Sequence, residues 1–449
     1  MDQNTLRIDQ SLEALQKCYT YSGEPAEVDD RLYADKSLDW KMLHYGQCAR
    51  SRIFCEGIFP ELIQFGTPDT IPVFQSHAAL VEFFWFLFGQ KAWNKLYAMF
   101  TATAPETLAA LPVEVADLYM LTCLRLNRKD YITEEGSAAL FRRLDRACAE
   151  IARIWPQDTA RKAYFDAIRA HVGGDIAGAR RIFVDVPQDI RLAGPLRAVG
   201  SVLPRPKPHA VSENGLEILS MSSARNVILI SLDKNYYDTY FEKFLVSLTA
   251  QQATWGLHLH CIGFTPDLRG METGGISLGV TVDRTEIASK SVEWNAAYSA
   301  CARYLYAATY LRIYSQILIC DVDGQITPRL HDIDRLHPDA DVLMFATLFF
   351  SPEKRANPLP WNAVSASDMV LRASPGGAAF AGGVGSYLDT VFAQGAFHSA
   401  PWFADQNALF YCYVDFLEEV VFARLHARVF TQAMDWRQFF GTTSKKGLT

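Results

Sequence analysis

The spacing of apolar residues along the chain changes near residue 200. Before this point, apolar residues recur every three or four positions, which is the period of a helix with one buried face. The pattern predicts helices over residues 114–127, 135–155 and 159–172, with few strand-like runs between them. We therefore predict that residues 1–200 form an all-α domain.

The last of these helices is followed by another one after a glycine turn. Gly173 and Gly174 separate residues 158–172 from a second helical pattern at 175–184, which favours an antiparallel helix hairpin. The hairpin is vaguely similar to a tetratricopeptide unit, although no repeat period is sustained along the chain. The segment 201–225 then contains three prolines without apolar periodicity, which predicts a linker.

Residues 226–449 have the pattern of an α/β domain. Short, continuous apolar runs typical of strands buried in a sheet alternate with helical patterns. The predicted strands are 226–231, 257–263, 316–320 and 342–350, and the predicted helices between them are 240–251 and 289–311. This alternation predicts a mixed sheet flanked by helices, preceded in the chain by the all-α domain.

Length and composition agree with two folded domains. The 449 residues exceed what one hydrophobic core usually organises. The chain has 49% hydrophobic and 21% charged residues, as ordinary globular proteins do. Its formal net charge of -7 argues against nucleic acid as a partner, because phosphate binding needs clustered Lys and Arg.

The sequence carries no signal for export or for membrane insertion. The nine cysteines are scattered without a Cys-x-x-Cys pair, so neither a disulfide framework nor a thiolate zinc site is predicted. The first residues lack a basic region followed by an apolar stretch. The most apolar windows, 78–89 and 342–350, are shorter than the roughly 20 residues that cross a bilayer. We expect a soluble, cytoplasmic protein without a transmembrane segment.

The sharpest candidate for chemistry is a pair of acids at the end of a predicted strand. Asp321 and Asp323 follow the apolar run 316–320, and ligands of open α/β sheets bind outside the carboxyl ends of strands. Mg²⁺ and Mn²⁺ prefer oxygen ligands and are commonly shared with substrate phosphates. Taken alone, the same spacing is also typical of a solvated turn after a strand.

Two histidines form a second candidate pair. His258 and His260 lie two residues apart and share one face of the predicted strand 257–263. Nothing nearby in the sequence supplies further ligands. We therefore favour core or surface histidines over a metal pair.

Five segments of the second half occur in the order and with the residue types of one known family. They are residues 228–236 with 244–248, then 298–305, 321–323, 380–384 and 402–409. Together they resemble the glycosyltransferase A fold, particularly its bacterial and glycogenin-like members, over roughly residues 226–440. The resemblance implies an enzyme that transfers a sugar from a nucleotide-sugar donor, most simply a UDP-sugar, to a glycan or protein acceptor.

The resemblance also implies roles for particular residues. Asp233, Tyr236 and Tyr237 match the part that holds the nucleotide base, and Arg303 matches an arginine that binds donor phosphates or sugar. Asp321 and Asp323 match the ligands of Mn²⁺ or Mg²⁺, with Asp321 also touching the donor. The remaining matches are Gly382 and Gly383 in a strand beside the sugar, and Asp405 and Gln406 as candidate catalytic residues that contact donor or acceptor sugar.

Some of these residues have plain structural alternatives. Arg303 can simply pair with an acid, and Asp405 can cap the helix that follows it. Many relatives take a third metal ligand from a histidine near the C-terminus, and His426 is the candidate here. Its surroundings, residues 424–428, have the pattern of a helix, which departs from the family.

Two other functions compete with the transferase. Residues 319–324 also resemble the first motif of haloacid-dehalogenase phosphatases, in which the first Asp is a nucleophile and the second a general acid. That family usually has Thr after the glycine and needs a later Gly-Asp motif, and this chain has neither. The other alternative is a non-catalytic scaffold or binding protein of the same fold.

We therefore predict residues 226–449 to be a metal-dependent glycosyltransferase domain, residues 201–225 a linker, and residues 1–200 a helical domain that binds the acceptor or a partner. Catalysis would depend on stabilising the leaving diphosphate and orienting the acceptor hydroxyl. The sequence identifies neither the sugar nor the acceptor.

Overall fold

The computed structural model describes most of the chain in two compact units. The described residues are 35–50, 58–67, 69–187, 192, 194–205, 207–251, 254–270, 273–286, 290–324, 326, 338–347, 355–393, 403–418 and 427–430. One unit consists of residues 1–197 and 350–356, and the other of residues 198–349 and 357–449. The chain therefore passes from the second unit into the first and back again between β6 and α16.

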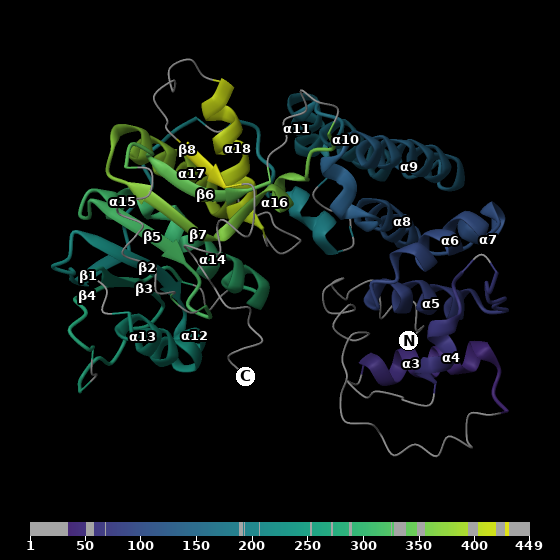
Figure 1. The fold of residues 1–449 in the computed structure, drawn as a ribbon, viewed down its shortest axis with the longest axis horizontal. Coiled ribbons are helices and arrows are strands. Elements are labelled where there is room, and N and C mark those ends of the chain that lie inside the picture. The colour runs from purple at the N-terminus through teal and green to yellow at the C-terminus, as the bar shows by residue number, and fades with distance from the viewer. Residues whose placement is uncertain are drawn as a thin grey trace. The chain divides into compact units, whose positions relative to one another are not determined.

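In its described part the first unit is helical (Figure 1). Its elements are α3 (Leu38–Arg50), α4 (Phe59–Gln64), α5 (His77–Gly89), α6 (Trp93–Ala102), α7 (Pro105–Ala109), α8 (Glu114–Arg125), the 3₁₀ helix η2 (Arg128–Ile132), α9 (Glu134–Ile154), α10 (Thr159–Val172) and α11 (Ile176–Asp185). The 3₁₀ helix η3 (Gly194–Ser201) spans the division between the units. The all-α prediction is confirmed for these residues.

The predicted hairpin is formed by α10 and α11, and each helix begins at a capping aspartate. The side chain of Asp158 accepts a hydrogen bond from the backbone N–H of Arg161, and that of Asp175 from Gly178. Such caps satisfy backbone donors that the first helical turn leaves without partners. The sequence pattern places these helices within two residues of their observed bounds because cap and apolar face are both local signals.

The second unit contains an eight-stranded mixed sheet. Its strands are β1 (Leu216–Ser220), β2 (Asn226–Leu232), β3 (Gly256–Ile262), β4 (Leu278–Asp283), β5 (Gln316–Cys320), β6 (Val342–Ala346), β7 (Val364–Arg372) and β8 (Ala427–Phe430). Their order in the sheet is β1-β4-β3-β2-β5-β7-β6-β8. Strands β4, β3, β2 and β5 are parallel, whereas β7 is antiparallel to both of its neighbours and β1 is antiparallel to β4.

The helices of this unit are α12 (Lys234–Tyr236), a π-helical turn η4 (Tyr237–Phe241), α13 (Glu242–Thr249), α14 (Val292–Leu305), α15 (Ala307–Leu311), α16 (Pro360–Ala363), α17 (Pro375–Ala393) and α18 (Ala404–Glu418). The predicted α/β architecture, a mixed sheet flanked by helices, is confirmed. The predicted helix 289–311 divides at Tyr306, whose backbone is non-helical, into α14 and α15.

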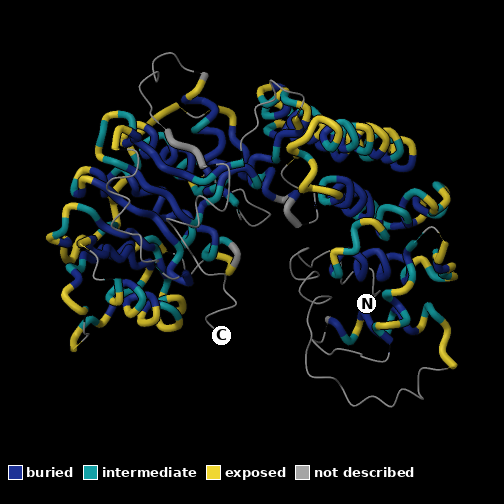
Figure 2. Tube along the Cα trace, in the orientation of Figure 1, coloured by how far each residue is buried: buried dark blue, intermediate teal, exposed yellow. Residues whose placement is uncertain are grey.

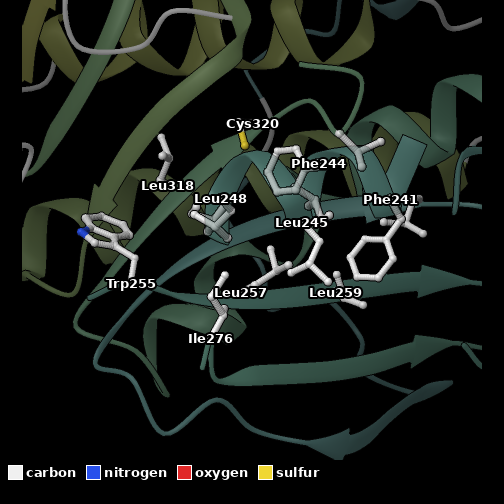
Figure 3. Packing of buried hydrophobic residues seen from close by; sticks show 14 of the residues in the cluster. Phe241, Phe244, Leu245, Leu248, Trp255, Leu257, Leu259, Ile276, Leu318 and Cys320 are labelled. Atoms are coloured by element: carbon white, nitrogen blue, oxygen red, sulfur yellow. The ribbon is translucent and has the colours of Figure 1, made fainter. Parts of the chain in front are cut away.

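The two faces of the sheet differ in chemistry because side chains alternate along a strand. Leu257, Leu259 and Cys261 of β3 belong to one hydrophobic cluster with Phe244 and Leu248 of α13. Figure 3 shows the packing of this cluster. The central strands are buried along their length (Figure 2). His258 and His260 alternate with these residues along β3 and therefore point to the other face of the sheet, where they contact Tyr314 and Tyr310.

One predicted boundary differs from the structure. The segment 201–225, predicted as a linker, contains the strand β1, which pairs with β4, and the division between the units falls at residues 197 and 198. β1 lies at a sheet edge, and most of its side chains are exposed. A short, exposed edge strand has no apolar run by which the sequence could reveal it.

Candidate functional site

The carboxyl ends of β2 and β5 lie where the order of the sheet reverses. β3 and β4 follow on one side of β2, whereas β5 pairs with β2 on the other side and runs parallel to it. Ligands of open α/β sheets bind outside the carboxyl ends of the strands at such a reversal. Asp233 follows β2 directly and Asp321 follows β5, so the topology brings these two predicted site residues to one place.

The acid pair after β5 has one accessible member and one buried member. The side chain of Asp321 is 41% exposed, and its Oδ1 lies 2.5 Å from Nη2 of Arg303. Asp323 is buried, although it follows only two residues later. The alternative of a wholly solvated turn is therefore wrong for Asp323.

Arg303 is a buried clamp between two strands. Its Nη1 donates to the carbonyl of Cys320 at the end of β5, at 2.7 Å, and its Nη2 donates to the carbonyl of Ala366 in β7, at 3.0 Å. Burial by itself lowers the pKa of Arg303, but nearby acidic groups, first among them Asp321, outweigh it, so the guanidinium stays charged. Arg303 thus pairs with an acid, and its side chain is only 5% exposed. This leaves donor binding by Arg303 a prediction.

Helix α14 passes the carboxyl ends of three strands in succession. The hydroxyl of Tyr298 donates to Asp283, the last residue of β4, at 2.8 Å. The hydroxyl of Ser231 in β2 donates to the carbonyl of Ser299, and Arg303 then reaches the last residue of β5. The helix that carries Arg303 therefore runs along the edge of the sheet where the acids lie.

Asp405 lies in the first turn of α18 with its carboxylate turned to the helix. Its Oδ1 accepts a hydrogen bond from the backbone N–H of the next residue, Gln406, at 2.8 Å. Because α18 already begins at Ala404, this is not the geometry of the capping alternative, in which the residue before the helix accepts from a donor two or three residues further on. Burial raises the pKa of Asp405 to about 6, against the opposing charge of Arg303. Oε1 of Gln406 is buried without a hydrogen-bond partner among the described residues. The first turn of α18 thus carries both a carboxyl group with a raised pKa, Asp405, and a buried hydrogen-bond acceptor, Gln406.

Asp233 and the two predicted tyrosines begin the first helix after β2. The Asp233 side chain caps α12 by accepting from the backbone N–H of Tyr236 at 2.8 Å. Tyr236 is 38% exposed. The ring of Tyr237 stacks on Phe241 and lies against Phe264, so its faces are partly covered. Of the two tyrosines, Tyr236 has the more accessible ring, and a π-helical turn, a feature frequent at functional sites, follows it.

Two serines that the sequence analysis does not consider lie beside the acid pair. Ser365 and Ser367 begin β7, share one of its faces, and are joined by their hydroxyls at 2.8 Å. The antiparallel ladder pairs Cys320 with Asp368, so β7 begins beside the segment that carries the acids. The alternation Ser-Ala-Ser could have revealed a shared face, but only the pairing with β5 places that face near Asp321.

The predicted strand around Gly382 and Gly383 is wrong, because both residues lie in α17. Pro375 starts this helix, and the hydroxyl of Ser374 accepts from the backbone N–H of Gly377, which is a helix-start signal stronger than the glycine content. Gly383 faces Phe416 of α18, and a Cβ atom at Gly382 would meet nothing within 4 Å. The small residues serve helix packing, above all at Gly385, where a Cβ atom would lie 2.7 Å from the carbonyl of Leu305.

The histidine candidates have different outcomes. His258 and His260 are fully buried, and the core interpretation is confirmed: His258 contacts Tyr314 and Thr281, and His260 contacts Tyr310. Burial lowers the pKa of His258 to about 3, so this ring is neutral. His426 lies outside the described residues. The helix predicted over residues 424–428 is wrong at its end, because β8 begins at Ala427.

The chemistry of the acid pair suits a hard divalent cation. Within the described residues, no group of three or more His, Cys, Asp or Glu side chains is placed to hold a metal ion. Mg²⁺, however, is usually held by one or two carboxylates, with water and substrate phosphates at its other positions. Asp321 and Asp323 match that donor set.

Comparison with known proteins finds likeness in structure alone. No family model and no curated protein matches the chain. Among solved structures, mouse xyloside xylosyltransferase 1 in its apo form is similar over 47% of this chain and 90% of that chain, with 11% sequence identity and a TM-score of 0.27. A likeness of this size assigns neither a family nor an activity to the chain. Within the described residues, no helix is long and apolar enough to cross a membrane.

Proposed function

We propose that the second unit is a metal-dependent glycosyltransferase that moves a sugar from a nucleotide-sugar donor, most simply a UDP-sugar, to a glycan or protein acceptor. The observation that carries the proposal is the gathering of Asp233, Asp321 and Arg303 around the carboxyl ends of β2 and β5. A nucleoside diphosphate fits this place because one strand end offers acids for a cation and the other offers an exposed aromatic ring.

In this proposal Asp321 and Asp323 hold Mn²⁺ or Mg²⁺. A cation bound there would supply neutralisation of the charge that builds on the leaving diphosphate. Arg303 fixes the direction of the Asp321 carboxylate, because its guanidinium is itself held by the backbones of β5 and β7. The Asp321 side chain is 41% exposed, so part of it remains accessible to the cation.

The remaining residues bind and orient the donor. Tyr236 supplies an accessible ring for stacking on the base, and Asp233 holds the turn that presents this ring. Ser365 and Ser367 offer two hydroxyls to the sugar from the neighbouring strand. Asp405 and Gln406 are retained as candidate catalytic residues, because a carboxyl with a pKa of about 6 can accept or give up a proton at neutral pH.

Isothermal titration with UDP, GDP and CMP, each with and without Mn²⁺, tests the proposal. We expect one nucleotide to bind only when the metal is present. The double variant Asp321→Asn/Asp323→Asn, which keeps the side-chain shapes and removes both charges, should abolish this binding. The matched control is Asp145→Asn/Asp166→Asn, which removes two exposed charges from the helical unit.

The outcomes separate the candidate functions. Metal-dependent binding that the control retains and the site variant loses supports the transferase and identifies the base. Binding of no nucleotide under any condition rejects it and favours a scaffold or a phosphatase. A phosphatase would release phosphate from p-nitrophenyl phosphate in a reaction that needs Asp321, whereas a scaffold would not.

A further inference from the structure

The start of α14 carries an aromatic cluster that the proposed donor site does not use. The rings of Trp294 and Tyr298 stack with centroids 5.0 Å apart and planes 7° apart. Phe392, near the end of α17, meets both rings edge-on, at 5.4 and 5.2 Å. Tyr298 is buried and fixed by its bond to Asp283, so it forms a rigid floor beneath Trp294.

The outer part of this cluster is accessible. Trp294 and Phe392 are partly exposed. We call Trp294 and Phe392 the aromatic platform. Exposed apolar side chains that gather in one place commonly mark a binding site.

A cation already lies over the indole of Trp294. Nζ of the exposed Lys290 is 5.5 Å from the ring centroid, within the range of a cation–π contact. The occupied face therefore attracts groups that carry positive charge density. The C–H bonds on one face of a pyranose ring are such groups, and its hydroxyls point outward in the ring plane, where the ammonium of Lys290 can bond them.

The platform lies on the helix that reaches the acid pair. Trp294 and Arg303 are nine residues apart in α14, which corresponds to roughly 14 Å along the helix axis. Arg303 contacts Asp321, so this axial distance of a few sugar rings separates the part of α14 that carries the platform from the part that reaches the proposed transfer site. This separation suits an extended acceptor and is too large for the transferred sugar itself.

We propose that the aromatic platform is an acceptor subsite, on which a pyranose ring of a glycan acceptor stacks against Trp294. This inference rests on the proposed transferase function and names its acceptor class as an oligosaccharide. Lys290 moves from the ring face to the hydroxyls of the bound sugar. Tyr298 and Asp283 keep the platform in place and do not touch the glycan.

The test is binding of the full-length protein to an array of short oligosaccharides built from common hexoses, pentoses and N-acetylhexosamines. Trp294→Ala should weaken retention about tenfold, equivalent to about 1.4 kcal/mol, which is the size of a good aromatic contact. Trp294→Phe should restore part of it. The control Val246→Ala removes an exposed apolar side chain from α13, outside the platform. Val246 is 65% exposed, and this variant should bind as the wild type does.

The array and the nucleotide titration answer different questions. Equal retention of the wild type and Trp294→Ala, or no retention of the wild type by any oligosaccharide, overturns the acceptor subsite. Titration of UDP with Mn²⁺ should give the same affinity for wild type, Trp294→Ala and Trp294→Phe, and thermal unfolding shows that each variant is folded. Absence of nucleotide binding in the wild type rejects the transferase alone, because retention on the array is measured without nucleotide.

Discussion

Replacing Arg303 by Met tests whether the end of the sheet depends on this one cation. The change keeps most of the side-chain length and removes the guanidinium that bonds the carbonyls of Cys320 and Ala366 and pairs with Asp321. The Ala366 carbonyl keeps a second donor, the hydroxyl of Tyr304 at 2.7 Å, so the loss falls mainly on the Cys320 carbonyl and on Asp321. The variant should therefore be less stable and should hold Asp321 less firmly.

The expected loss follows from the exposure of each partner. A hydrogen bond from a charged group contributes about 1.5–3 kcal/mol, and the variant loses two of them, the one at Ala366 costing less because the Tyr304 hydroxyl remains. Breaking a buried ion pair costs about 3–5 kcal/mol, but Asp321 is 41% exposed and water can solvate it, so this contribution is smaller. We expect a total of about 3–5 kcal/mol. For a domain of about 150–250 residues this lowers Tm by on the order of 10 °C.

Differential scanning calorimetry of the full chain measures this shift. The matched control is Arg269→Met, because Arg269 is almost fully exposed and, among the residues that the structure describes, pairs with its near neighbour Asp267. Arg303→Lys should lie between the wild type and Arg303→Met, since a lysine keeps the charge without the planar fork that reaches two strands. If the Tm of Arg303→Met lies within a degree or two of the Tm of the control, Arg303 does not hold the ends of β5 and β7 together as we predict.

Three further predictions concern other parts of the second unit. Burial raises the pKa of Asp405 to about 6 from an ordinary value of 3.8, so the folded state binds the proton more tightly and stability falls as the pH rises between these values. Asp405→Asn should remove that fall in urea midpoints measured against pH, and an unchanged slope would contradict the burial argument. A hydrogen bond to Asp389 raises the pKa of His209, so this contact adds stability below the ordinary value of 6.5 that is lost as the pH rises through the raised pKa. In an NMR titration, Asp389→Asn should return the His209 pKa toward 6.5, and no change would mean that the pair does not form. Gly385→Ala should destabilise by about 1–3 kcal/mol because its Cβ atom would meet the Leu305 carbonyl, whereas Gly382→Ala, in open space, should be neutral or stabilise by up to about 1 kcal/mol. Loss of nucleotide binding in Gly382→Ala would instead favour a glycine beside the sugar.

The sequence predicts the buried strands of the sheet best. The run 316–320 matches β5 at both ends, and 226–231 falls one residue short of β2. These strands are buried on both faces, so nearly every side chain is apolar and the signal is local. The sequence does not predict β1, for the opposite reason. β1 is an exposed edge strand that pairs with β4 and carries no apolar run.

In the candidate site, too, features that depend on adjacent residues could be predicted, whereas contacts between distant segments could not. That Asp321 and Asp323 stand at a strand end follows from the sequence, since the strand and the acids are adjacent. That Arg303 pairs with Asp321 and with Ala366 requires β7 and α14 to meet at that end, and residues 63 apart in the chain carry no local sign of it. The glycines of α17 mislead because small residues are read as a strand beside a ligand, although the helix start at Ser374 and Pro375 precedes them in the sequence.

Helix α14 connects the two ends of the proposed reaction. Its first turns carry Trp294 on a floor set by Tyr298 and Asp283, and its last turn carries Arg303, which fixes Asp321. An α-helix is stiff over this length, so the spacing between the platform and the acid pair is set by the helix itself and not by loops. The residues that stiffen this helix at the strand ends, Tyr298 and Arg303, are buried and bonded, whereas those proposed to meet ligands, Trp294 and Asp321, are partly exposed. Such a separation of supporting and contacting side chains is what holds a site in a fixed geometry.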